Sequence, residues 1–252
     1  MKITVLGSGS AFSDPSRFNS AYLVESEDQT FLIDCGSDAL RALQKAKTDL
    51  FSIGDIFLTH LHADHSGGLP AVLTAMHVLD RKSPVEVHVP STQLEFVRLW
   101  LANLFIYNRR MSFETTLVPI HAGTKKLNAH LEIEFIPTKH LQKYAEHAAA
   151  AEIKPLSFSV IVREGNNSFF FSSDFGSINE VRSYLECSLA LVEATHPNIE
   201  DIAEITKRPH GRIFLTHIPQ ELEIGGKWRS ELYSKFNVEE LNVVHDGQVF
   251  TI

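Results

Sequence analysis

The amino-acid sequence predicts an α/β fold in which two mixed β-sheets pack face to face and helices cover the outside, an αββα sandwich. The chain falls into two similar halves, each a run of short apolar strands followed by helices. Histidines and aspartates recur where the predicted strands end. No linker or low-complexity tract interrupts the 252 residues, so we expect residues 1–252 to form a single domain.

In the first half, alternating or continuous apolar runs predict strands at 2–6, 21–25, 30–34, 55–59, 85–89 and 114–120. The second and third of these flank Glu27 and Asp28, a polar pair that suits a hairpin turn. Apolar residues at helical spacing predict helices at 37–47, 69–79 and 91–103.

In the second half, strands are predicted at 131–137, 156–162, 168–171, 188–193 and 212–215. Residues 141–155 between the first two form a polar, alanine-rich segment. Residues 241–244 and 249–252 flank Asp246 and Gly247, a pair favoured in tight turns, and predict a final hairpin.

The composition narrows the class of protein. A hydrophobic content of 44% suffices for a large core, while a formal net charge of −8 disfavours a protein that binds long nucleic acids. Two cysteines form neither a disulfide framework nor a metal-type pair. The first apolar run is too short for a signal peptide and no run is long enough for a membrane span, so we expect a cytoplasmic protein with no membrane partner.

Residues 59–69 concentrate side chains that bind metals. Three histidines and an aspartate, His60, His62, Asp64 and His65, fall within six residues. If the preceding strand ends at His60, its period of two places the side chains of His60 and His62 on one side. Asp64 and His65 would then project from the turn that follows. Imidazole and carboxylate groups suit zinc, iron or manganese.

This H-x-H-x-D-H pattern resembles that of the metallo-β-lactamase superfamily. The resemblance implies the same αββα sandwich and two divalent metal ions, zinc first, with manganese or iron as alternatives. It implies a metal-bridging hydroxide as the nucleophile. By resemblance, the first ion takes His60, His62 and His140, the second takes Asp64, His65 and His217, and Asp174 bridges both.

Further segments resemble the phosphodiesterase-like branch of that superfamily. Residues 7–20, 32–36, 65–70 and 193–195 are similar to ribonuclease Z, and residues 192–198 and 216–219 to class II cyclic-nucleotide phosphodiesterases. Val192 stands where ribonuclease Z has a histidine, and neither its His-Ser-Thr motif nor its long arm is present. The predicted function is therefore a hydrolase of small or cyclic phosphodiesters. The alternatives are a tRNA 3′-processing endonuclease and a lactone or thioester hydrolase.

The candidate catalytic residues are Asp64, Glu193 and His196, the last two as proton donors to the leaving group. Alternatively, Glu193 orients a ligand or caps a helix, and His196 is an ordinary turn histidine. Asp34 is expected to orient a ligand rather than to cap the helix after it. The expected partner is a small phosphodiester, and the resemblance adds a homodimer.

Overall fold

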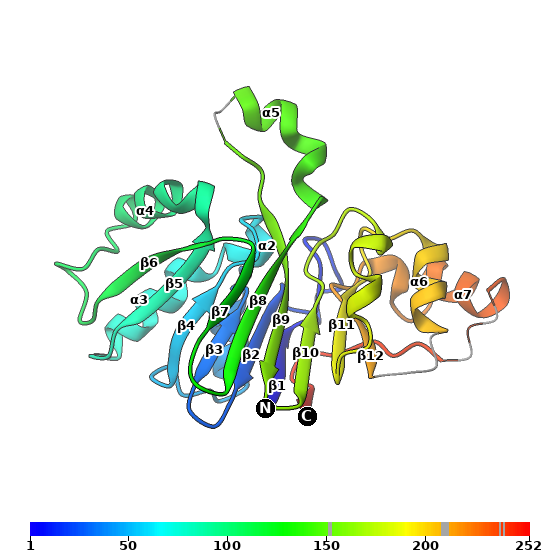
Figure 1. The fold of residues 1–252 in the computed structure, drawn as a ribbon, viewed down its shortest axis with the longest axis horizontal. Coiled ribbons are helices and arrows are strands. Elements are labelled where there is room, and N and C mark those ends of the chain that lie inside the picture. Colours follow the sequence, from blue (N-terminus) through cyan, green and yellow to red (C-terminus); the bar gives the residue numbers. More distant parts are fainter. Residues whose placement is uncertain (151–152, 208–211, 237, 239) are drawn as a thin grey trace.

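The computed structural model describes residues 1–150, 153–207, 212–236, 238 and 240–252. Two β-sheets pack face to face with helices outside, so the predicted αββα sandwich is confirmed (Figure 1). The ends of the chain lie side by side. The backbone N–H of Ile252 donates to the carbonyl of Met1 at 3.1 Å, and the N-terminal ammonium of Met1 donates to the carbonyl of Ile252 at 3.0 Å.

The first sheet has the strand order β13-β1-β2-β3-β4-β5-β6. Its strands are β1 (Lys2–Gly7), β2 (Ala21–Glu25), β3 (Thr30–Ile33), β4 (Ile53–Phe57), β5 (Val85–Pro90), β6 (Thr115–Ile120) and β13 (Val249–Thr251). From β3 to β6 neighbouring strands run parallel, so their carboxyl ends meet at one edge.

The second sheet has the order β12-β11-β10-β9-β8-β7. Its strands are β7 (Gly123–Lys126), β8 (Leu131–Thr138), β9 (Ser157–Glu164), β10 (Asn167–Phe171), β11 (Leu189–Glu193) and β12 (Ile213–Thr216). The last three are parallel, and their carboxyl ends again share an edge.

Three apolar cores hold these layers together. One fills the space between the sheets, around Phe57, Phe135 and Phe171. Another lies under α1 (Ala39–Lys45), α3 (Leu69–Val78) and α4 (Leu94–Asn103) on the outer face of the first sheet. The last lies under α6 (Ile199–Thr206) and α7 (Lys227–Ser234) on the outer face of the second sheet.

The remaining helical segments are short. They are α2 (Ala63–Ser66), α5 (Ala145–Ala150) and 3₁₀ turns at Ser91–Gln93, His140–Tyr144, Ile178–Glu180, Arg182–Tyr184 and Gln220–Leu222. Helix α5 projects away from the sandwich (Figure 1). It belongs to the alanine-rich segment 141–155, of which residues 151 and 152 lie outside the described residues.

The predicted C-terminal hairpin is wrong. Val249–Thr251 pairs antiparallel with β1 in the first sheet, whereas Val243 makes an isolated bridge to Leu215 beside the second. Residues 245–248 do form a tight turn, in which the backbone N–H of Gln248 donates to the carbonyl of His245 at 3.0 Å, but the segments on either side of it pair with different sheets. The Asp246 carboxylate accepts hydrogen bonds from the backbone N–H groups of Ser8 and Phe18. No helix in the described part of the chain is both long and apolar enough to cross a membrane.

Candidate metal centre

The carboxyl ends of strands from both sheets converge on one cluster of histidines and aspartates. Chain segments that follow β4, β8, β10 and β12 supply it. The cluster brings together the seven residues predicted as ligands, His60, His62, Asp64, His65, His140, Asp174 and His217, and Glu193 and His196 lie with Asp174 and His217 in the same cluster. They share one place because parallel strands of each sheet end at the same edge.

The local path differs from the one predicted for residues 55–65. Strand β4 ends at Phe57, two residues early, so the period of a strand does not place His60 and His62. Their rings nevertheless lie together, with centroids 4.7 Å apart. The expected turn is helix α2, which carries Asp64 and His65. A Cβ at Gly68 would lie 2.1 Å from the carbonyl oxygen of Gly36, so only glycine permits this close passage.

Asp174 lies between two groups of ligand-type atoms and turns one oxygen toward each. Its Oδ2 lies 3.4 Å from His140 Nε2 and 3.7 Å from His60 Nε2. Its Oδ1 lies 3.3 Å from His65 Nε2. On that second side, His217 Nε2 lies 3.1 Å from Asp64 Oδ2 and 3.3 Å from His65 Nε2. Ligand-type atoms therefore lie on both sides of the Asp174 carboxylate.

The unsatisfied atoms of the cluster fit a metal. Among the described residues, His60 Nε2, Asp174 Oδ1 and His217 Nδ1 are buried without a hydrogen-bond partner. Unpaired buried polar atoms are costly, so three of them in one cluster fit a site that binds a cation. Donors about 2.0–2.1 Å from one tetrahedral zinc ion lie roughly 3.3 Å apart, close to the separations found here.

The charges of the cluster also favour a cation. Burial raises the pKa of Asp174, but the imidazoles of His217 and His65 outweigh it and hold that pKa well below its ordinary value. Burial lowers the pKa of His217, but Asp174, Asp64 and Glu193 raise it overall to about 10 in the metal-free chain. Near neutral pH His217 therefore carries a proton that a metal would displace, so metal affinity should fall as the pH decreases.

Asp34 contacts the segment of residues 59–65, as expected. Its fully buried carboxylate accepts bonds from His65 Nδ1 at 2.6 Å and from the backbone N–H of Thr59 at 2.8 Å. Asp38, not Asp34, stands at the N-terminus of α1.

Asp34, Ser173 and His217 all have positive φ, at 59°, 46° and 52°. Such backbone is costly outside glycine and persists where its surroundings hold it.

Glu193 and His196 form a pair beside Asp174. The Glu193 carboxylate is fully buried and accepts bonds from the backbone N–H groups of Thr195 and His196 at 3.0 and 2.9 Å. It also lies 3.0 Å from His196 Nδ1. Burial lowers the pKa of His196, but Glu193 raises it above its ordinary value. With a side chain that is 26% exposed, His196 is the member of the pair that reaches the surface.

A hollow of about 650 Å³ opens beside the cluster. It is lined by Lys139, His140, Lys143, Phe175, Gly176, Ser177, Asn179, Glu180 and His196. Sequence patterns did not identify Lys139, Lys143 or Asn179 as lining residues, because the hollow joins segments that are distant along the chain. Tyr144 lies beside the cluster, with its ring centroid 5.9 Å from that of His62.

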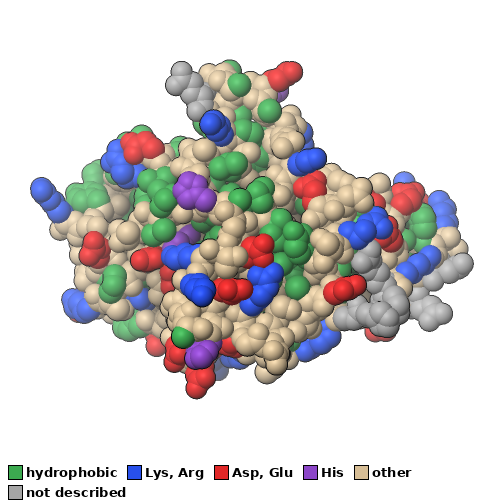
Figure 2. Space-filling view, in the orientation of Figure 1, with side chains coloured by type: hydrophobic (Ala, Val, Ile, Leu, Met, Phe, Trp, Pro, Cys, Tyr) green, Lys and Arg blue, Asp and Glu red, His purple; other side chains and the backbone are tan. Residues whose placement is uncertain are grey.

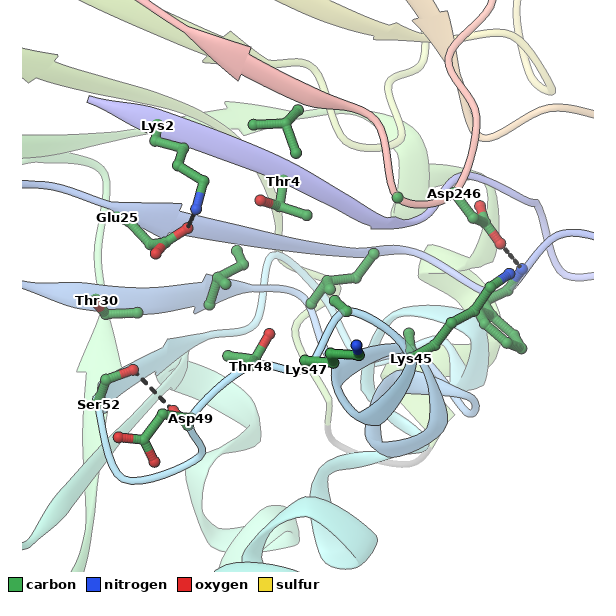
Figure 3. A pocket seen from close by; sticks show the side chains of 17 residues that line it. Lys2, Thr4, Glu25, Thr30, Lys45, Lys47, Thr48, Asp49, Ser52 and Asp246 are labelled. Carbon is green, nitrogen blue, oxygen red and sulfur yellow. Dashed lines mark hydrogen bonds and ion pairs between the residues drawn. The ribbon is translucent and has the colours of Figure 1, made fainter.

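A second hollow, of about 560 Å³, lies on the outer face of the first sheet (Figure 3). Lys2 and Glu25 form an ion pair at one end of it, and Lys45 and Asp246 stand at the other. None of the seven clustered residues lines it. This hollow is therefore not the place where the clustered groups would meet a substrate.

Comparison with known proteins agrees with the site. The structure superposes on the metallo-β-lactamase fold protein YhfI from Bacillus subtilis with a TM-score of 0.75 at 20% identity, covering 99% of this chain and 98% of that one. Ribonuclease Z from Methanosarcina acetivorans is 34% identical over 102 residues, 40% of this chain and 33% of that protein. The chain spans less than half the length of the ribonuclease Z relatives it matches.

Fold and site together place the chain among proteins with the metallo-β-lactamase fold. The family model described as Anti-Pycsar protein Apyc1 matches residues 1–224, so the chain belongs to that family. Anti-Pycsar protein Apyc1 of Bacillus phage BSP38 is 25% identical over 249 residues, 88% of this chain and 90% of that protein.

Proposed function

We propose that this protein hydrolyses small or cyclic phosphodiesters at a centre of two divalent metal ions. The observation that carries the proposal is the two-sided cluster around Asp174, which opens onto a hollow of about 650 Å³. Clefts of roughly 300–1,000 Å³ are typical of sites for small molecules. Two cations at its rim, Lys139 and Lys143, suit an anionic substrate.

The ligand assignment is part of the proposal. One ion takes His60, His62 and His140, the other takes Asp64, His65 and His217, and Asp174 belongs to both. When bound, divalent ions lower the pKa of bound water and stabilise negative charge that develops on the phosphoryl oxygens. Zinc suits the imidazole and carboxylate ligands, and manganese or iron are the alternatives.

His196 is the proposed proton donor to the leaving group. Glu193 holds its Nδ1 at 3.0 Å and favours the charged imidazolium, while the ring lines the hollow. Glu193 itself is fully buried, and the nearby imidazoles of His196 and His217 outweigh the effect of burial to lower its pKa. Glu193 therefore suits the orientation of His196 better than the protonation of a substrate. Asp64 acts through the second ion.

The charge distribution on the surface is less suited to binding long nucleic acids than to binding small substrates. On the face shown in Figure 2, the described lysine and arginine side chains are interspersed with acidic ones and form no continuous stripe. The whole chain carries a formal charge of −8. Phosphate contacts supply most non-specific affinity for nucleic acids, so such a surface favours small substrates.

The homodimer that the resemblance implies stays a prediction. Phe96, Leu99 and Phe105, on α4 and the turn after it, are 57%, 47% and 66% exposed and offer it an apolar face. Sedimentation velocity of the intact chain would check it.

Elemental analysis of fully active protein should find about two metal ions per chain, because the seven ligand-type residues divide into two groups around Asp174. Removal of the metal with a chelator should lower the free energy of unfolding by about 4 kcal/mol for a site that was held at a thousand times its Kd. Calorimetry before and after chelation measures this. One ion or none in fully active protein would refute the binuclear centre.

Small phosphodiesters should be hydrolysed at least about 100-fold more efficiently than precursor tRNA is cleaved at its 3′ end, a difference of about 2.7 kcal/mol. The physical reason is the small hollow and the acidic net charge. A 3′,5′-cyclic nucleotide, a bis-aryl phosphodiester, a lactone, a thioester and precursor tRNA should be compared at physiological salt. Efficient, site-specific tRNA cleavage would contradict the proposal, and preferred hydrolysis of the lactone or thioester would point to the other alternative.

A further inference from the structure

Thr59 directly precedes the cluster, and its hydroxyl group lies where four polar atoms meet. Its Oγ1 lies 2.9 and 3.0 Å from the two carboxylate oxygens of Asp34 and 2.7 Å from Ser173 Oγ. The fourth atom is His60 Nδ1, at 3.2 Å. Thr59, Asp34 and His60 are fully buried and Ser173 is 1% exposed, so the hydrogen bonds must be made within this group.

Counting donors and acceptors decides the direction of each bond. A hydroxyl group has one proton to donate and two lone pairs that accept. The Asp34 carboxylate only accepts, and it already receives bonds from the backbone of Thr59 and from His65 Nδ1. The Thr59 proton therefore goes to Asp34. Its lone pairs then accept from the Ser173 hydroxyl and from His60 Nδ1–H.

This count fixes the protonation pattern of His60. A proton on Nδ1 leaves the lone pair on Nε2, which is the atom that lies toward Asp174 and has no hydrogen-bond partner. The same logic applies to His65, whose Nδ1 is held by Asp34 while Nε2 lies toward Asp174. Partners of this kind fix the tautomer and orientation of a metal-binding histidine.

The hydroxyl also joins the two sheets at the site. Asp34 and Thr59 follow β3 and β4 of the first sheet, whereas Ser173 follows β10 of the second and precedes Asp174. Asp34 and Ser173 have positive φ, so each of these turns needs contacts that hold it. A single oxygen atom contacts both.

We propose that Thr59 is a positioning residue of the metal centre. Its hydroxyl holds His60 as the Nδ1–H tautomer and keeps the His60 end of the first sheet in register with the Asp174 end of the second. This role of Thr59 in orienting a metal-binding histidine rests on the proposed metal assignment but not on the identity of the substrate.

Imidazole ¹⁵N NMR of the zinc-loaded wild-type protein tests the tautomer directly. His60 should bind zinc through Nε2 and carry a proton on Nδ1. Zinc binding through Nδ1, or an unprotonated Nδ1, would overturn the proposal whatever the variants do. If no zinc bound to any of the clustered histidines, the metal assignment itself would fail, which is a different outcome.

Two substitutions at Thr59 separate the hydroxyl group from the shape of the side chain. Thr59→Val keeps the shape and loses the oxygen, so zinc affinity at the site of His60, His62 and His140 should fall about 10- to 100-fold, measured by competition with a chelating dye. Thr59→Ser keeps the oxygen and should lose less than about tenfold. Equal affinities for wild type and Thr59→Val would contradict the inference.

Ser173→Ala is the matched control. It removes one bond to the same hydroxyl, and should lower the melting temperature, but it leaves the bond between Thr59 and His60 intact. The ¹⁵N signature of His60 should therefore be unchanged in this variant and altered in Thr59→Val. The same change of signature in both variants would reduce Thr59 to an ordinary structural role.

Discussion

Asp174→Ala is expected to deplete both metal sites and to lower hydrolysis of every phosphodiester by roughly 10²–10³-fold or more, the loss typical when a group that serves charge stabilisation is removed. The reason is the position of its carboxylate. Oδ2 lies 3.4 Å from His140 Nε2 in one group, and Oδ1 lies 3.3 Å from His65 Nε2 in the other. Elemental analysis and kcat should be measured on the same preparation.

Substitutions on one side provide the comparison. His65→Ala and His217→Ala should deplete the second site more than the first, and His140→Ala should do the reverse. Asp246→Ala is the matched control, because the Asp246 carboxylate also accepts hydrogen bonds, from the backbone N–H groups of Ser8 and Phe18, but belongs to none of the groups of described residues that could hold a metal. It should keep its full metal content. Retention of one full equivalent of metal by Asp174→Ala would show that Asp174 does not serve both sites.

His196→Ala is expected to slow the release of poor leaving groups by about 10²–10⁴-fold and to leave metal content intact. A ribose hydroxyl or other alkoxide needs a proton as it departs, whereas an activated aryl oxide needs little. Turnover of a bis-aryl phosphodiester should therefore fall far less than that of a cyclic nucleotide. The measurement is kcat on both substrates, with metal quantified in each sample.

Glu193→Gln separates orientation from proton donation. Glutamine retains an oxygen for the backbone N–H groups of Thr195 and His196 but no longer stabilises the charged imidazolium. We expect the same selective loss as in His196→Ala, smaller in size. His60→Ala should instead damage both substrates together. Equal losses on both substrates, or lost metal, in the His196 and Glu193 variants would assign the pair to a structural role.

Much of the fold could be predicted because most strands appear in the sequence as local apolar runs. The apolar runs that form β2, β8 and β10 are long and bounded by polar turns, so their existence and approximate limits follow from the sequence. Helices α6 and α7 were not predicted. Helix α7 carries a single fully buried apolar residue, Leu232, so its sequence shows little of the apolar spacing that predicts a helix. That residues 1–252 form a single domain stays a prediction, which a single unfolding transition would support.

The residue types and their order determined the candidate metal ligands. A run of imidazoles and carboxylates after an apolar strand has few roles other than metal binding, so His60, His62, Asp64 and His65 stood out without a structure. His140, Asp174 and His217 came from resemblance, and the fold confirms that all seven residues meet. Their roles as ligands stay a proposal.

Only the tertiary structure decided which roles we propose for Glu193, His196 and Thr59. Glu193 and His196 are equivalent candidates along the chain, but burial is complete for Glu193 and partial for His196, and this separates an orienting group from one that reaches the hollow. Thr59 resembles any strand-end threonine until Asp34, Ser173 and His60 surround its oxygen. Sequence determines which chemistry is available, whereas the distance and burial that give each group its role arise when distant strand ends meet.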